Sequence, residues 1–175
     1  MIKISGVTYK FDKSKPQILK RGIIDAYDLS SKSNEWVVLS RYIFWSAELQ
    51  RVIIVPNWFN TDLSSIPKAL RWIISVNERH RIASLPHDFL YRLGSEYTFS
   101  QKHADKVLRE FCELMGVPSW KVNAIYWGVR MGGWASFNRG KKMFIEKSHR
   151  IFYKNALYFL QLELRDGHYL QVNKG

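Results

Sequence analysis

The hydrophobic pattern of this chain changes period near residue 68, and this change constrains the fold more than any other feature of the sequence. From Lys68 onward, apolar residues recur every three or four positions, as they do along the buried face of a helix. Before that point, alternating or continuous runs of β-branched and aromatic residues predict the strands of a small sheet. These runs cover residues 2–9, 36–39, 42–45 and 51–55. The pattern therefore predicts an α+β fold, with a small N-terminal β-sheet region followed by helices.

Cap and turn residues divide the helical part into a packed bundle of about four helices. Ser100 is a good N-cap, and Gly116 is a good terminator for the helix that Ser100 starts. Pro86 is expected to bend or restart the helix that contains it, because proline cannot donate a backbone hydrogen bond. The predicted helices begin near Lys68, cover about 78–93, lie between Ser100 and Gly116, and extend from Pro118 to about Met131.

The remaining segment, residues 136–175, is predicted to form a basic helix and a β-hairpin. Six Lys or Arg residues lie between Arg139 and Lys154 among aromatic and aliphatic residues, and Asp166-Gly167 is a strong turn signal. We expect one domain over 1–175, with a strand-rich part at 1–60, a helical core at 61–135 and this tail.

Charge and cysteine content exclude several classes of protein. The formal charge of +12 favours an anionic partner, which means nucleic acid, anionic lipid or the bacterial envelope. The single Cys112 excludes an intramolecular disulfide and a thiolate zinc cage. No apolar run approaches the roughly 20 residues of a membrane-spanning helix, and residues 1–20 lack a signal-peptide core. We therefore expect synthesis in a cytosol.

Four residues with proton-handling or metal-binding side chains form the candidate site. Tyr91 lies three and four positions after Asp88 and His87, so the three share a helix face. Asp105 lies at the margin of the next helix's apolar stripe, where an ionised carboxylate needs a partner. If it accepts a hydrogen bond from one nitrogen of His87, the other nitrogen is free to take a proton from water. Asp88 is then free to bind a cation, and Tyr91 can donate to either carboxylate.

A buried polar network that joins two helices without doing chemistry is the alternative interpretation. Asp62 has two readings as well, as a further cation ligand or as the cap of the turn before Lys68. Cys112 lies on the inner side of its helix and is expected in the core. Ser64 and Ser65 lack a nucleophile-elbow sequence, and the chain has no phosphate-binding or dinucleotide-binding loop.

Four motifs in this order resemble an uncharacterised family of tailed phages and prophages, domain of unknown function 1353. They are Thr61–Pro67, His87–Arg92, Ala104-Asp105 and Met115–Pro118. The resemblance spans roughly residues 60–133. It implies a phage or prophage origin, synthesis in the host bacterial cytoplasm and phage virion proteins as partners, and it supplies no activity.

The pattern of His87, Asp88 and Tyr91 followed by a helix with Asp105 is also similar to the two-helix site of phospholipases A2. In that family the His activates water, the adjacent Asp holds calcium, the second-helix Asp orients the His, and the Tyr supports it. The resemblance implies these roles for the four residues, with calcium as the cofactor. Those enzymes use a glycine-rich calcium loop, whereas residues 57–68 contain no glycine.

Two functions follow from these observations. The first is a metal-dependent hydrolase that acts on the bacterial envelope when a phage penetrates or lyses its host, with phospholipid as the favoured substrate and peptidoglycan as a variant. The second is a non-enzymatic virion or accessory protein whose basic surface binds DNA, membrane or a partner protein. A His-Asp phosphohydrolase is a weaker third class, because only the poorly spaced His80 lies upstream.

Overall fold

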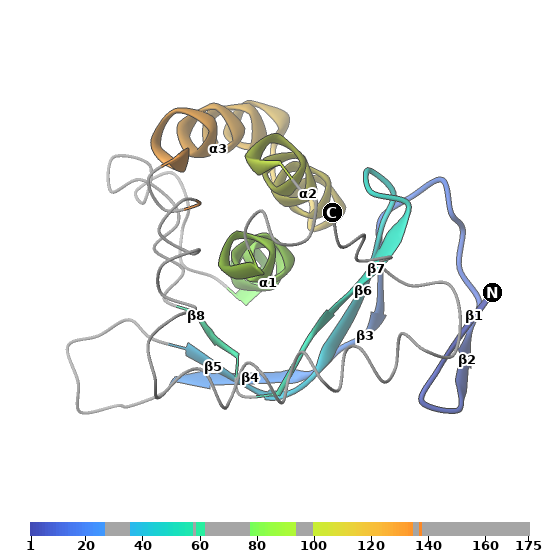
Figure 1. Ribbon diagram of the computed structural model, residues 1–175. Helices are drawn as coiled ribbons and strands as arrows, with labels where there is room; N and C mark the ends of the chain where they lie inside the picture. The colour runs from blue at the N-terminus through green and yellow to red at the C-terminus, as the bar shows by residue number, and fades with distance from the viewer. Residues whose placement is uncertain (27–35, 58, 62–77, 94–99, 135–136, 138–175) are drawn as a thin grey trace, which may run out of the picture.

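The computed structural model describes residues 1–26, 36–57, 59–61, 78–93, 100–134 and 137, and it is α+β (Figure 1). Strands occupy the N-terminal part and helices follow, as the change of period predicts. The predicted helix beginning near Lys68 lies outside the described residues. The predicted basic helix and hairpin of the tail also lie outside them, apart from Phe137.

Within the described residues, eight strands form three small antiparallel sheets, with orders β1-β2, β3-β6-β7 and β4-β5-β8. The four predicted runs are strands in the structure, whereas β3, β4 and β8 were not predicted. In β6 and β7 the continuous apolar character does reflect burial, because nearly every residue of both strands is buried. The strands are β1 Ile2–Ile4, β2 Val7–Tyr9, β3 Gln17–Lys20, β4 Ile23–Ala26, β5 Trp36–Ser40, β6 Tyr42–Ser46, β7 Arg51–Val55 and β8 Asn60–Thr61.

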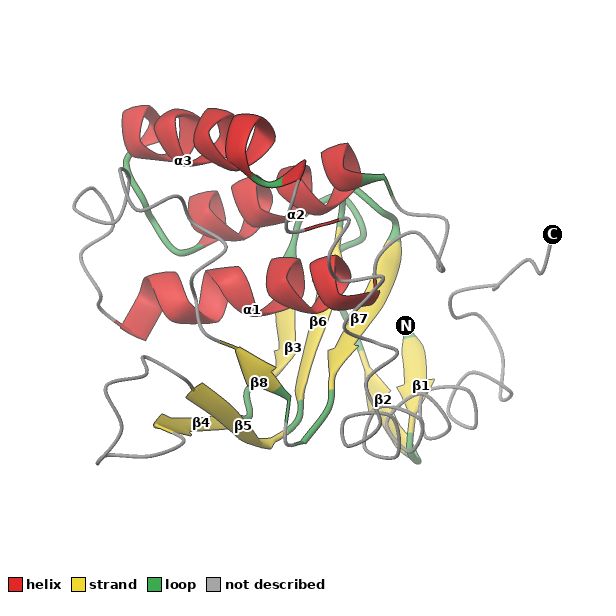
Figure 2. Cartoon of the chain, turned by 60° about the vertical axis from the view of Figure 1, so that its left-hand side comes forward, coloured by secondary structure: helices red, strands yellow, loops and turns green. Residues whose placement is uncertain are grey.

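In the part of the chain that the structure describes, three helices lie in layers over these sheets, with α1 nearest the strands and α3 farthest from them (Figure 2). They are α1 Glu78–Leu93, α2 Gln101–Leu114 and α3 Ser119–Gly132. Ser100 caps α2 as predicted, since its hydroxyl accepts a hydrogen bond from the His103 backbone N–H at 3.3 Å. Of the two effects expected at Pro86, a bend or a restart, the restart does not occur, because α1 continues through this residue.

Aromatic contacts and one acidic side chain fix α1 and α2 on the strands. The Phe44 ring meets the edge of Phe111 in α2 at 5.1 Å, and Phe59 meets Phe89 in α1 at 5.5 Å. Glu110 of α2 accepts hydrogen bonds from the Ser46 hydroxyl and from the backbone of the β6–β7 turn. Because α2 is held at this point, the position of Asp105, little more than one turn away, is fixed as well.

Candidate functional site

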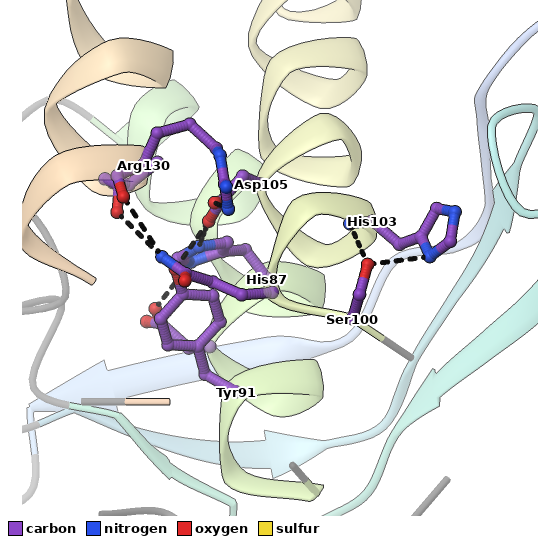
Figure 3. A network of polar contacts seen from close by, with 9 residues as sticks. His87, Tyr91, Ser100, His103, Asp105 and Arg130 are labelled. Carbon is purple, nitrogen blue, oxygen red and sulfur yellow. Dashed lines mark hydrogen bonds and ion pairs between the residues drawn. The ribbon is translucent and has the colours of Figure 1, made fainter. Parts of the chain in front are cut away.

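The contact between α1 and α2 brings His87 and Asp105 together (Figure 3). His87 Nε2 lies 3.2 Å from Asp105 Oδ1, and both side chains are buried. Asp105 sits among the buried residues of α2 although it is charged, because its carboxylate faces α1 rather than the strands. The predicted pairing of an imidazole from one helix with a carboxylate from the next is confirmed.

The Asp105 carboxylate accepts hydrogen bonds from two further side chains. The Tyr91 hydroxyl donates to Oδ1 at 2.5 Å, and Arg130 Nη1 of α3 donates to Oδ2 at 2.9 Å. Arg130 compensates the charge of a carboxylate that is 0% exposed, which burial alone would disfavour. Sequence reasoning missed Arg130. Its only local signal is its place beside Val129 on the buried face of α3.

Tyr91 is held in a fixed orientation by its neighbours. Its ring lies 4.1 Å from that of His87 and meets the edge of Phe137 at 5.3 Å. Burial first, and then the Asp105 carboxylate, raise the pKa of Tyr91, so the hydroxyl remains a donor. A Cβ at Gly133 would collide with this hydroxyl and with the Val129 carbonyl, so the close approach at the end of α3 requires glycine there.

Asp88 is engaged at both carboxylate oxygens. The Thr61 hydroxyl of β8 donates to Oδ2 at 2.5 Å, and His87 Nδ1 lies 3.3 Å from Oδ1. The prediction that the second nitrogen of His87 is left free is therefore wrong for this arrangement, because Nδ1 faces Asp88. Thr61 is the first residue of the Thr61–Pro67 motif. Asp62, the predicted cation ligand or turn cap in that motif, lies outside the described residues.

The described residues do not by themselves make up a calcium site. Calcium in proteins takes about six to eight oxygen ligands. At this end of the network the described residues supply the Asp88 carboxylate and the Thr61 hydroxyl. Within those same described ranges, no group of three His, Cys, Asp or Glu side chains is placed to hold a metal ion.

The two carboxylates decide the protonation of His87. Burial by itself lowers the pKa of His87, but hydrogen bonds and charge from Asp105 and Asp88 outweigh burial and raise the pKa above its usual value. An imidazole with a carboxylate at each nitrogen is best satisfied as an imidazolium, which donates from both. The neutral form therefore appears only when the pH passes the raised pKa.

We expect the stability of the protein to depend on pH through His87. Because the pKa is higher in the folded state, the contribution of His87 is complete below its unfolded pKa, near 6.5. It is lost as the pH rises from about 6.5 through the folded pKa, by up to about 1.4 kcal/mol per pH unit. Urea unfolding across this window measures the loss. His103→Asn, at an exposed histidine, should keep the dependence and His87→Asn should remove it; an unchanged slope in His87→Asn would contradict this expectation.

Cys112 is part of the core rather than of the site. Its side chain is buried in α2, and burial raises the pKa of the thiol to about 12. A thiol that stays protonated at neutral pH is a poor nucleophile. The expectation that Cys112 serves the core is consistent with this.

Comparison with known protein families shows that most of the site lies within a catalogued domain family. Residues 36–129 match the family model "Protein of unknown function (DUF1353)". The chain belongs to this family. The matched region of the DUF1353 domain runs from β5 to the last turn of α3 and contains Thr61, His87, Asp88, Tyr91 and Asp105, while Arg130 follows directly after it. No curated protein and no solved structure matches the chain.

Proposed function

We propose that this DUF1353 protein is a phage-encoded hydrolase of the bacterial envelope, with phospholipid esters as substrate and His87 as general base. The observation that carries the proposal is the 3.2 Å contact of His87 with Asp105, to which Tyr91 also donates. Enzymes orient a histidine base by a hydrogen bond from its ring to a carboxylate, and a third residue often fixes that carboxylate. The similarity to the phospholipase A2 helix pair supports the choice of substrate.

Asp105 is the positioning residue in this proposal. Arg130 pairs with Oδ2 of its carboxylate, and Oδ1 accepts the Nε2 proton of neutral His87 and keeps it in place. The lone pair of neutral His87 is then on Nδ1, on the side of Asp88. A water molecule reaches Nδ1 only if the contact between Nδ1 and Asp88 Oδ1 opens, and that contact, at 3.3 Å, is slightly longer than an ordinary hydrogen bond. In the opened site the water donates one proton to Nδ1 and the other to Asp88.

Ester hydrolysis then takes two steps. In the first, the water oxygen bonds to the ester carbonyl carbon while His87 Nδ1 takes the water proton, which produces a tetrahedral intermediate and an imidazolium. In the second, the bond from carbon to the alcohol oxygen breaks, and the imidazolium returns its proton to the departing lysophospholipid. The other product is a fatty acid, and His87 ends neutral, as it began.

Incubation of the full chain with phosphatidylglycerol vesicles tests the proposal. We expect fatty acid and lysophospholipid in equal amounts. Parallel reactions with calcium and with a chelator test the cofactor that the phospholipase resemblance implies. Purified peptidoglycan replaces the vesicles in a third reaction, and cleavage of peptidoglycan alone would assign the variant substrate. Absence of ester hydrolysis both with and without calcium would overturn the proposed activity.

A second function is favoured by the burial of His87. The side chain is 1% exposed and has a carboxylate at each ring nitrogen, as in a network that only joins helices. In that case the protein is a non-enzymatic virion or accessory protein, and its basic surface binds DNA, membrane or a partner protein. DNA binding that falls steeply with salt, in a protein that hydrolyses neither substrate, would establish this alternative.

A further inference from the structure

The outer face of α3 carries large apolar side chains that contact solvent. Trp120, Trp127 and Met131 are 60%, 61% and 79% exposed, and Trp134, just beyond the helix, is 68% exposed. At 100° per residue these four positions fall within an arc of about 60°. Gly133 keeps a helical backbone, so Trp134 continues the same line. We call these four residues the tryptophan stripe.

The tryptophan stripe is not the face by which α3 joins the fold. The opposite face of α3 buries Val122, Ile125 and Val129 toward α2. In both ribbon views α3 is the outermost of the three helices (Figures 1 and 2). Single exposed apolar residues are common on protein surfaces, but several large ones gathered on one face usually mark an interaction site.

Along the sequence, the charged residues that flank the tryptophan stripe are of one sign. No acidic residue lies between Glu113 and Glu146. The basic residues in this interval are Lys121, Arg130, Arg139, Lys141 and Lys142. One of them, Lys121, has its ammonium 5.5 Å from the centroid of the Trp120 ring, so positive charge borders the stripe directly. A partner that complements this surface needs negative charge to meet the basic residues and, beneath that charge, an apolar layer to accept the tryptophan rings.

We propose that the tryptophan stripe docks the protein on the surface of an anionic lipid bilayer. Tryptophan rings favour the boundary between headgroups and acyl chains, and nearby lysine and arginine add attraction to anionic headgroups. None of the described helices is long and apolar enough to span a membrane. Because the exposed apolar side chains lie on one face of α3, the proposed docking places the helix in the plane of the interface. The docking deepens the proposed function, because it delivers a phospholipid hydrolase to its substrate.

Binding to ether-linked phosphatidylglycerol vesicles tests docking separately from hydrolysis, because these lipids contain no ester to cleave. We expect the full chain to sediment with such vesicles and to bind neutral phosphatidylcholine vesicles much more weakly. The variant Trp120→Ser/Trp127→Ser/Trp134→Ser should lose about tenfold in partitioning for each tryptophan removed. The control Val7→Ser/Ile23→Ser changes apolar residues that are 53% and 59% exposed on β2 and β4, and it should bind as the unmodified chain does.

Quenching of tryptophan fluorescence by brominated phosphatidylglycerol provides a second readout that needs no variant. We expect strong quenching in the unmodified chain. Lack of vesicle binding, or equal binding by the triple variant, would overturn the docking proposal. Concentration-dependent self-association that the triple variant loses, without vesicle binding, would likewise overturn it and assign the stripe to a second copy of the chain. If docking holds and ester vesicles remain intact, only the hydrolase proposal fails.

Discussion

Replacing His87 by Asn is expected to reduce the rate of phospholipid hydrolysis by about 10²–10⁴-fold, the usual contribution of a general base. Asn retains a polar side chain near Asp105 but has no nitrogen that can take a proton from water. Initial rates of fatty acid release, at saturating vesicle concentration, measure the loss. His103→Asn is the matched control, because His103 is exposed and its ring is hydrogen-bonded to the capping Ser100, away from the His87 network.

The dependence of the rate on pH separates a lost base from a damaged fold. A base must be neutral, so the rate of the unmodified chain should rise with pH through the raised pKa of His87. The residual rate of His87→Asn should lack this rise, and its circular dichroism should match that of the unmodified chain. If the variant folds and keeps the full rate, His87 is not the base. The same proton loss that activates His87 also removes its contribution to stability, so activity and stability should change in opposite directions with pH.

The three described helices could be predicted from the sequence because local residues mark where each helix begins and ends. Ser100, Gly116 and the Pro118-Ser119 pair mark helix ends through backbone hydrogen bonding and conformation, which depend little on distant residues. The missed strands lack such signals. In β3 two apolar residues stand side by side between polar ones, and β8 has only two residues. These segments are strands because β6 and β5 offer them partners, which is a tertiary effect.

The candidate site also contains contacts that local sequence signals predict and contacts that depend on tertiary packing. Helical spacing placed His87 and Tyr91 on one face, and the apolar stripe of α2 indicated that Asp105 needs a partner, so this part was predictable. The approach of Arg130 depends on how α3 crosses α2, and that of Thr61 depends on the pairing of β8 with β5. Neither geometry is encoded in a local period. This is why the Asp88 side of His87 was predicted to be open and is occupied.

Replacing Asp105 by Ala is expected to lower the free energy of unfolding by about 3–5 kcal/mol, the usual cost of removing one partner of a buried ion pair. The substitution removes the acceptor for His87, Tyr91 and Arg130 together. Arg130 can turn its guanidinium toward solvent because its side chain is 29% exposed. His87 is buried, so its Nε2 must lose a proton or stay unpaired, although Nδ1 still faces Asp88. Urea unfolding at pH 6, where His87 is protonated in the unmodified protein, measures the full loss.

Glu113→Ala is the matched control for this prediction, since it removes another carboxylate from the same helix. Glu113 pairs with Arg109 at 3.1 Å across one turn, and both side chains are about half exposed. An exposed pair of this kind contributes only about 0.3–0.5 kcal/mol. If Asp105→Ala costs no more than Glu113→Ala, Asp105 does not hold the helices together, and the orientation it is proposed to impose on His87 loses its basis. Arg130→Met removes only the ion pair with Asp105, so we expect it to lower the free energy of unfolding by less than Asp105→Ala does. The difference between the two losses would then come from the hydrogen bonds of Asp105 with His87 and Tyr91.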